Sequence, residues 1–168
     1  MGGRATNNEH RFQRQTVEKV NNEISALLGE FCSQYILCGS YRRNLNTIGD
    51  MDYVLVVDHG KNNISDKAHE LKDKITSNSK RSIIEYPTEE GNIQIDFYSA
   101  SNEDFGAQVL TWTGSKDFNI RCRGMAKRLG FKLNQYGLFQ NEQLISTNEA
   151  EILNKLGFGK FIIPSARV

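Results

Sequence analysis

The chain has 168 residues, of which 38% are apolar and 24% charged, and its formal net charge is +1. This length fits one domain or two small lobes, and no run of about 18 apolar residues exists to cross a membrane. The N-terminal stretch lacks the apolar segment of a secretory signal. The cysteines are three in number and form no C-x-x-C pair. Their pattern argues against a disulfide framework or zinc site and favours a reducing compartment, cytoplasmic or nuclear.

The first part of the chain predicts helix, strand, strand, helix, strand and strand. The ranges are 9–31, 35–38, 53–57, 64–77, 82–86 and 93–98. Residues 41–49 are polar and predict a turn-rich stretch. The run 53–57 is continuously apolar, which is typical of a central strand covered on both faces. Pro87 is expected to stop the strand before it, and residues 89–92 to form a hairpin turn.

The second part predicts two helices, a strand pair and a last helix. The ranges are 103–110, 115–129, 132–139 with 143–145, and 146–156. Ser146 and Glu149 have capping-box spacing, and Gly157 would end the last helix. Charge changes sign near residue 103: residues 82–104 hold six acidic and no basic residues, whereas residues 115–132 hold six basic residues and one acid. We therefore expect a domain boundary there.

Three aspartates carry the candidate chemistry. Asp50 and Asp52 are two residues apart at the start of the apolar strand, so their side chains share one face. Asp96 lies on the polar face of the alternating strand 93–98, and strand pairing could bring it alongside. Converging carboxylates need cations, and hard oxygen ligands suit Mg²⁺, which shares its shell with phosphates and water. Two such ions could clamp an in-line phosphoryl displacement.

A Gly-Ser pair precedes these acids. Gly39 allows close approach of the backbone to a ligand, and Ser40 can donate to a phosphate oxygen. Either Arg42 or Arg43 can add a charge-assisted contact to a triphosphate. Gly49 permits a second close approach. Asp-x-Asp or Gly-Ser alone also fits a solvated turn, and only their combination with a later strand aspartate is specific.

The motifs together resemble those of the family X DNA polymerases, the group that contains DNA polymerase beta. The matching stretches are G-S-Y-R-R (39–43), G-D-M-D (49–52), T-W-T-G-S (111–115), Phe118-Asn119, Arg123 and F-K-L-N-Q-Y-G-L-F (131–139). The resemblance covers about residues 34–166. It implies an α+β fold with a nucleotidyltransferase palm, a mixed sheet with helices, in residues 1–103. A small C-terminal α/β subdomain that binds nucleotide and DNA would occupy residues 104–168.

The resemblance also implies residue roles. Asp50, Asp52 and Asp96 would bind two Mg²⁺ ions, for which Mn²⁺ could substitute, and Asp96 would help deprotonate the primer 3′-hydroxyl. The residues implied for the incoming dNTP are Gly39, Ser40, Arg43, Gly49, Trp112, Thr113, Gly114 and Asn119. Those implied for DNA contact are Arg121, Arg123 and Lys127, with Asn134, Gln135 and Tyr136 supporting closure of that lobe.

The expected activity is template-directed addition of dNTPs to a primer 3′-hydroxyl, in short-gap filling during DNA repair. The expected partners are gapped or primer-template DNA and dNTP, with the chain as a monomer of viral or phage origin. Only the helix 9–31 precedes the palm in this sequence, so we expect neither a lyase activity nor DNA binding by a helix-hairpin-helix module. Arg4, Arg11 and Arg14 could instead help to hold the DNA. Two alternatives stay open: a nucleotidyltransferase with a protein, small-molecule or RNA acceptor, and a non-catalytic DNA-end binding module.

Overall fold

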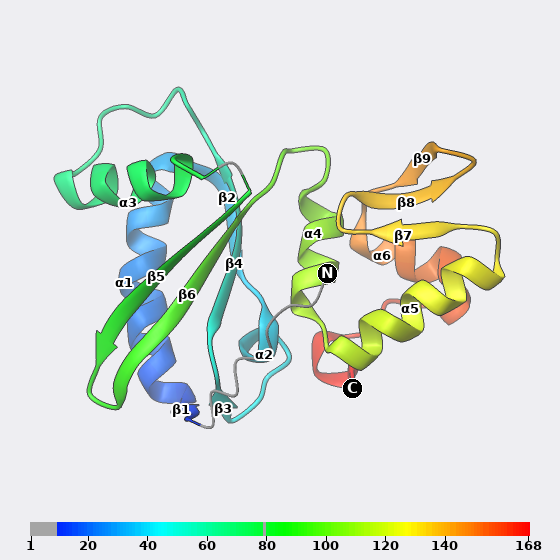
Figure 1. The fold of residues 1–168 in the computed structure, drawn as a ribbon, viewed down its shortest axis with the longest axis horizontal. Coiled ribbons are helices and arrows are strands. Elements are labelled where there is room, and N and C mark those ends of the chain that lie inside the picture. The colour runs from blue at the N-terminus through cyan, green and yellow to red at the C-terminus, as the bar shows by residue number, and fades with distance from the viewer. Residues whose placement is uncertain (1–9, 79) are drawn as a thin grey trace.

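The computed structural model describes residues 10–78 and 80–168. Figure 1 shows two lobes side by side. The N-terminal lobe carries a four-stranded sheet and the long helix α1, and the C-terminal lobe, from α4 onward, carries helices and a three-stranded sheet. The expected α+β fold with a mixed sheet is confirmed. Arg4 lies outside the described residues.

The sheet of the N-terminal lobe has the strand order β2-β4-β6-β5, with β4 and β6 parallel and the other pairs antiparallel. Its strands are β2 (Cys32–Leu37), β4 (Met51–Val57), β5 (Arg81–Thr88) and β6 (Gly91–Ser99). Strand β4 is central and buried on both faces, as its apolar run predicts. The parallel pairing places the start of β4 beside the middle of β6, and this register positions the site.

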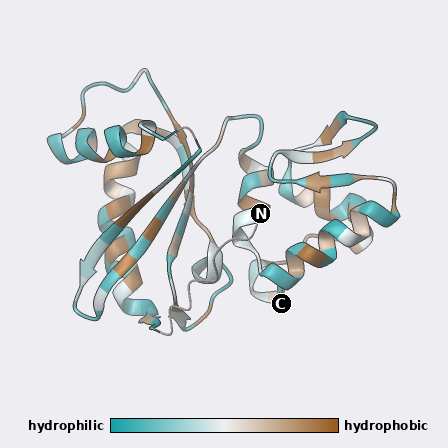
Figure 2. Cartoon of the chain, in the orientation of Figure 1, coloured by the Kyte–Doolittle hydropathy of each residue, from teal (hydrophilic) through white to brown (hydrophobic). Residues whose placement is uncertain are grey.

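Two helices cover one face of this sheet. Helix α1 (Arg14–Phe31) and helix α3 (Asp66–Thr76) pack their apolar sides against inward residues of β4 and β6, among them Tyr53 and Phe97. Ser65 caps α3 by accepting a hydrogen bond from the Ala68 backbone N–H. Figure 2 shows the alternation of apolar and polar residues along β5 and β6. Because successive side chains of a strand point to opposite faces, the helices cover the face with odd-numbered residues of β4 and β6. The face with the even-numbered residues is left for the site and the C-terminal lobe.

In the N-terminal lobe, several helices and strands begin or end at residues other than those predicted from the sequence. Pro87 does not stop β5, because β5 is an edge strand and the missing N–H of proline costs no ladder bond there. The first helix begins at Arg14, since a two-residue strand β1 (Phe12–Gln13) precedes it and pairs with β3 (Thr47–Ile48). The stretch 41–49, predicted to be rich in turns, includes the end of α2 (Gly39–Arg42), a helix of one turn, and strand β3.

The C-terminal lobe begins with α4 (Phe105–Thr113), which runs past the predicted end at residue 110, and α5 (Lys116–Arg128). The predicted strand 132–139 is broken at a turn into β7 (Lys132–Asn134) and β8 (Gly137–Gln140), with β9 (Gln143–Ser146) alongside. Gly137 adopts φ 149°, and a Cβ there would lie 2.9 Å from the Ser146 carbonyl oxygen. The break therefore depends on a glycine between closely packed backbones.

The last helix also differs from its prediction. Asn148, not Ser146, caps α6 (Glu149–Leu153), and the Asn148 side chain accepts from the Glu151 backbone N–H. Ser146 instead donates to the Glu151 carboxylate. A π-helical turn (Asn154–Phe158) and a 3-10 turn (Pro164–Ala166) complete the lobe. The cap moved because Asn148 has the same preference for this position as serine and lies nearer the first apolar residues.

None of the helices in the described ranges is long and apolar enough to cross a bilayer.

Candidate active site

The aspartates lie on the sheet face that the helices leave open. In the parallel pairing of β4 and β6, Asp52 is the direct partner of Asp96. Asp50 precedes β4 by one residue and has the same parity as Asp52. One carboxylate oxygen from each of the three residues lies within 4.8 Å of the other two. The structure thus brings together the three carboxylates that the sequence pattern selected.

Burial and mutual repulsion make Asp50 and Asp52 costly to ionise. Asp96 is only 1% exposed, and Asp50 and Asp52 are partly buried. Burial raises the pKa of Asp50, with a further contribution from the Asp96 charge. Burial also raises the pKa of Asp52 well above its usual value, and the charges of Asp50 and Asp96 add to it. Arginine side chains nearby oppose both shifts without cancelling them.

Two residues that the sequence patterns did not single out hold Asp96 in place. Arg81 Nε and Nη2 donate to Asp96 Oδ1 at 2.8 and 2.5 Å, and Gln94 Nε2 donates to Oδ2 at 2.8 Å. The predicted hairpin could have identified Arg81, because a two-residue turn at 89–90 pairs Ile83 with Asp96. Arg81 then lies on the same face, two residues along.

The Gly-Ser loop packs directly on the acidic cluster. Gly39 begins α2 with φ 59°, and a Cβ on it would lie 2.7 Å from Asp52 Oδ2. Only glycine combines this backbone conformation with so close an approach. The Cys38 backbone N–H donates to the Asp52 carbonyl oxygen at 2.7 Å. A Cβ on Gly49 would meet only the Arg11 guanidinium, at 3.2 Å.

The two arginines that end the loop have different partners. Arg42 donates to both carboxylate oxygens of Glu149 and to the Thr113 hydroxyl. Arg43 donates to the Thr113 carbonyl oxygen at 2.6 Å, and burial lowers its pKa. Because Glu149 and Thr113 occupy the Arg42 fork, Arg43 is the one of the two that could turn to a phosphate.

The segment 112–119 lies at the junction between the lobes. Trp112 stacks on Tyr98 of β6 with ring centroids 3.8 Å apart, and Asn119 donates to the Thr111 carbonyl oxygen at 2.7 Å. Thr113 is fully buried, and Gly114 has φ 67° and ψ −153°. The backbone of this segment is thereby fixed beside the acidic face, while the nucleotide contacts expected of it stay predictions.

The basic residues of α5 are exposed. Phe118, Cys122 and Ala126 form its buried side, whereas Leu129, the residue after the end of α5, is 50% exposed. Arg121, Arg123 and Lys127 face solvent on the remaining surface. The helix therefore presents free positive charge at the surface.

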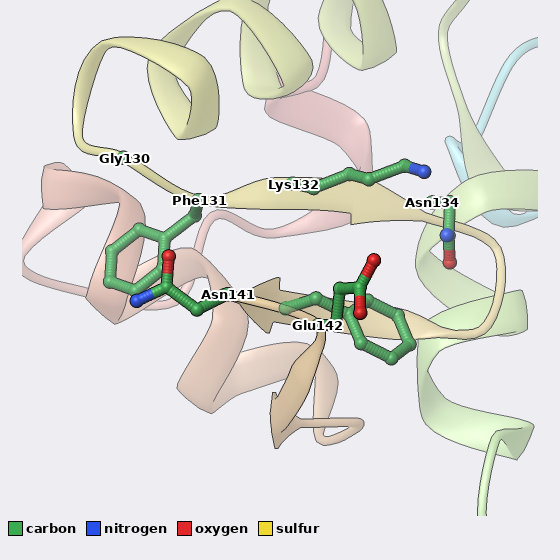
Figure 3. Close-up of a pocket in the computed structure, with 7 residues that line it drawn as sticks. Gly130, Phe131, Lys132, Asn134, Asn141 and Glu142 are labelled. Carbon is green, nitrogen blue, oxygen red and sulfur yellow. The ribbon is translucent and has the colours of Figure 1, made fainter.

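The turn between β7 and β8 reaches the N-terminal lobe. Asn134 accepts from the Tyr136 backbone N–H, and Lys80, next to β5, lies over the Tyr136 ring at 5.7 Å from its centroid. Hydrogen bonds from Lys80 and Gln135 lower the pKa of Tyr136. The C-terminal lobe also has a pocket of about 400 Å³, and Phe131, Lys132 and Glu142 are among its lining residues (Figure 3). It includes none of the aspartates.

The aspartate cluster fits divalent cations. All three side chains offer oxygen, the donor that Mg²⁺ and Mn²⁺ accept most readily. Among the residues that the structure describes, the three aspartates form one ion pair with an arginine, the pair between Asp96 and Arg81. Burial and, after it, the neighbouring carboxylates raise the pKa of Asp50 and Asp52, and a cation bound at the cluster would oppose both shifts. A mixed sheet with this cluster and a Gly-Ser loop beside it defines a nucleotidyltransferase.

Comparisons with known proteins identify the family. The DNA polymerase beta palm model matches residues 10–133, and the DNA polymerase beta thumb model matches residues 108–168. The chain is 31% identical over 166 residues to the Repair DNA polymerase X of an African swine fever virus isolate, covering 89% of this chain and 94% of the relative. It is 32% identical over 145 residues to the DNA polymerase/3′-5′ exonuclease PolX of Bacillus subtilis, covering 81% of this chain and 24% of that protein.

The chain therefore belongs to the DNA polymerase beta family, the family X polymerases, and is an enzyme of that family. Members of this family use divalent metal ions, which agrees with the chemistry of the cluster.

Proposed function

We propose that the chain is a repair DNA polymerase that fills short gaps by adding dNTPs to a primer 3′-hydroxyl. The observation that carries the proposal is the convergence of three carboxylates within 4.8 Å in a chain of this family. The African swine fever virus relative is named a repair polymerase, which supports the repair context.

Asp50, Asp52 and Asp96 would hold two Mg²⁺ ions, with Mn²⁺ as a substitute. When bound, these ions would supply charge neutralisation for the attacking and leaving oxygens of the displacement. Asp96 would accept the proton of the primer 3′-hydroxyl, and Gln94 and Arg81 orient its carboxylate for that task. The proton would leave the hydroxyl as the new phosphodiester bond forms and pyrophosphate departs.

The incoming nucleotide would lie along the junction of the lobes. Gly39, Ser40 and Arg43 would bind its triphosphate, because Gly39 packs against Asp52 and the Arg43 guanidinium lies beside Gly114. Gly49 would leave room for the same phosphates. Trp112, Thr113 and Gly114 would border the sugar, and Asn119 the base.

DNA would be held by the exposed cations of α5. Arg121, Arg123 and Lys127 would contact phosphates, which gives sequence-independent and salt-sensitive affinity. Asn134, Gln135 and Tyr136 would support closure through the Lys80 contact. We also propose the division into residues 1–103 and 104–168, a monomeric state and work in the cytoplasm or nucleus. Each of the two parts has a buried cluster of its own, which supports the division, although a third and smaller cluster joins them. The three free cysteines support a reducing compartment.

Primer extension tests the proposal. The purified chain with Mg²⁺ should insert one dNTP into a duplex with a one-nucleotide gap, and Asp96→Ala should abolish the insertion. Asp73→Ala, on the exposed side of α3, is the matched control and should extend as the wild type does. No extension by the wild type, or undiminished extension by Asp96→Ala, would contradict the proposal. Transfer of labelled nucleotide without DNA would favour a non-DNA acceptor.

A further inference from the structure

A buried ion network joins the last residues of the chain to the Gly-Ser loop. Glu149, at the start of α6, accepts from Arg42 at 2.8 and 3.0 Å and from Arg167 at 2.5 Å. The Arg167 side chain is fully buried, and the side chains of Glu149 and Arg42 are 13% and 18% exposed. Separating the partners of a buried ion pair costs free energy, because it leaves a buried charge without an opposite charge beside it. The geometry of these pairs is therefore well fixed.

Arg167 is itself fixed from several sides. Its Nε and Nη2 donate to the Ile162 carbonyl oxygen at 2.9 and 2.7 Å, and its guanidinium lies over the rings of Phe118 and Phe161. Phe118 belongs to the buried side of α5. The C-terminal segment therefore clamps Glu149 against the core of the C-terminal lobe.

Arg42 links Glu149 to the Gly-Ser loop of the N-terminal lobe. It is the last residue of α2, a helix of four residues whose first two are Gly39 and Ser40. Its guanidinium also donates to the Thr113 hydroxyl at 2.8 Å, and Arg43 donates to the Thr113 carbonyl oxygen. With its last side chain held, a helix of one turn has little freedom to move relative to Thr113.

Close packing of α4 against the segment before α6 supports the same geometry. A Cβ on Gly106 would lie 2.5 Å from the Thr147 carbonyl oxygen and 3.4 Å from the Glu149 backbone nitrogen. The backbone that carries Glu149 is thus pressed onto the helix that ends at Thr113. The backbone at Glu149 therefore cannot move closer to α4.

We propose that Glu149, held by Arg167, is a positioning residue for dNTP binding. It fixes Arg42 and so sets the Gly-Ser loop at the distance from Thr113 and Gly114 that a triphosphate nucleotide requires. The inference rests on the proposed function, because the loop is taken as the triphosphate site. Glu149 does not touch the nucleotide, and it acts through Arg42.

The test separates nucleotide binding from catalysis and from stability. Trp112 is the only tryptophan in the chain and lies beside Thr113, so its fluorescence can report titration with Mg²⁺-dTTP in the presence of a gapped duplex with a dideoxy-terminated primer. Glu149→Gln should raise the dTTP dissociation constant about tenfold or more and raise KM similarly, with kcat less affected. The affinity for gapped DNA should stay unchanged. Glu151→Gln, on the same helix, is the matched control.

A double variant distinguishes positioning from a structural role. Glu149→Leu with Arg167→Met removes one charge of each sign and should recover most of the thermal stability lost in Glu149→Gln. Because Arg42 still lacks its carboxylate, dTTP binding should stay weak. If binding recovers together with stability, or if Glu149→Gln binds dTTP as the wild type does, the inference is overturned. No dTTP binding and no extension by the wild type would instead refute the proposed function.

Discussion

The N-terminal and C-terminal lobes handle charge in opposite ways. The N-terminal lobe gathers three carboxylates on the face of a packed sheet, where two of them have raised pKa values. The C-terminal lobe spreads basic side chains along the exposed surface of α5, and it pairs a fully buried cation, Arg167, with Glu149. Buried like charges cost stability and bind small, highly charged partners tightly, whereas exposed charges cost little and bind an extended polyanion weakly at many points.

This difference predicts how each lobe responds to loss of charge. A substitution of Asp50 or Asp52 should abolish catalysis and improve folding, because burial and the neighbouring carboxylates make these charges unfavourable in the folded state. A substitution on α5 should weaken DNA binding in proportion to the number of charges removed and leave folding unchanged.

The largest expected effect is that of Asp52→Asn. Extension of a gapped primer should fall by at least about 10³-fold, because a buried oxygen ligand is lost from the site that stabilises the transferred phosphoryl group. The same variant should melt at a higher temperature than the wild type in EDTA. The two measurements are single-turnover extension and thermal unfolding. A variant that is both inactive and less stable would show that Asp52 supports the fold rather than burdening it.

The next effect belongs to the cations of α5. Arg123→Ala and Lys127→Ala should each weaken binding of gapped DNA about five- to tenfold at low salt and lower the slope of log affinity against log salt by about one. Extension at saturating DNA should be retained. Lys74→Ala, on α3, is the control of equal charge. An unchanged salt slope in both α5 variants would place the DNA elsewhere.

A smaller effect is expected of Arg81, the cation that the N-terminal lobe keeps beside its acids. Arg81→Gln removes the ion pair to Asp96, so the Mn²⁺ dissociation constant, measured by electron paramagnetic resonance, should fall about threefold. The arginine is half exposed, and solvent screening keeps the change modest. Lys80→Gln, its neighbour, should leave Mn²⁺ affinity unchanged. Weaker Mn²⁺ binding by Arg81→Gln would mean that Arg81 chiefly orients Asp96.

The two lobes also differ in how well the sequence predicts them. In the N-terminal lobe, strand alternation and the Asp-x-Asp spacing predicted that Asp50, Asp52 and Asp96 would converge, because these signals depend only on local periodicity. Arg81 and Gln94 needed the hairpin register as well. The two-residue turn at 89–90 determines that register.

The C-terminal lobe depends more on contacts between distant segments. The sequence predicts one strand over 132–139 without the break before Gly137, and it predicts the cap at Ser146 instead of Asn148, since both features depend on which backbone segments pack together. The network of Arg42, Glu149 and Arg167 connects distant parts of the chain. Arg42 and Glu149, which are hydrogen-bonded to each other, are 107 positions apart in the sequence. No helical or strand period relates them, so only the folded structure could reveal the network.

The smallest expected effect is a pH dependence that belongs to the N-terminal lobe alone. The pKa of Asp52 is raised on folding, so the folded state resists its ionisation. Its unfavourable contribution is absent below the unfolded pKa of about 4 and grows as pH rises toward the raised folded pKa. In EDTA, the melting temperature of Asp52→Asn should therefore exceed that of the wild type by an amount that increases from pH 4 upward, by about 3 °C for each kcal/mol.

Saturating Mg²⁺ provides the control for this measurement. Cations at the cluster compensate the charge of Asp52, so the gap between wild type and variant should close or reverse at neutral pH when Mg²⁺ replaces EDTA. A gap that is independent of both pH and Mg²⁺ would mean that the asparagine stabilises the chain by a hydrogen bond and not by relief of repulsion. In that case the buried carboxylates of the N-terminal lobe would not lower stability by repulsion, and the proposed energetic difference from the exposed cations of α5 would be wrong.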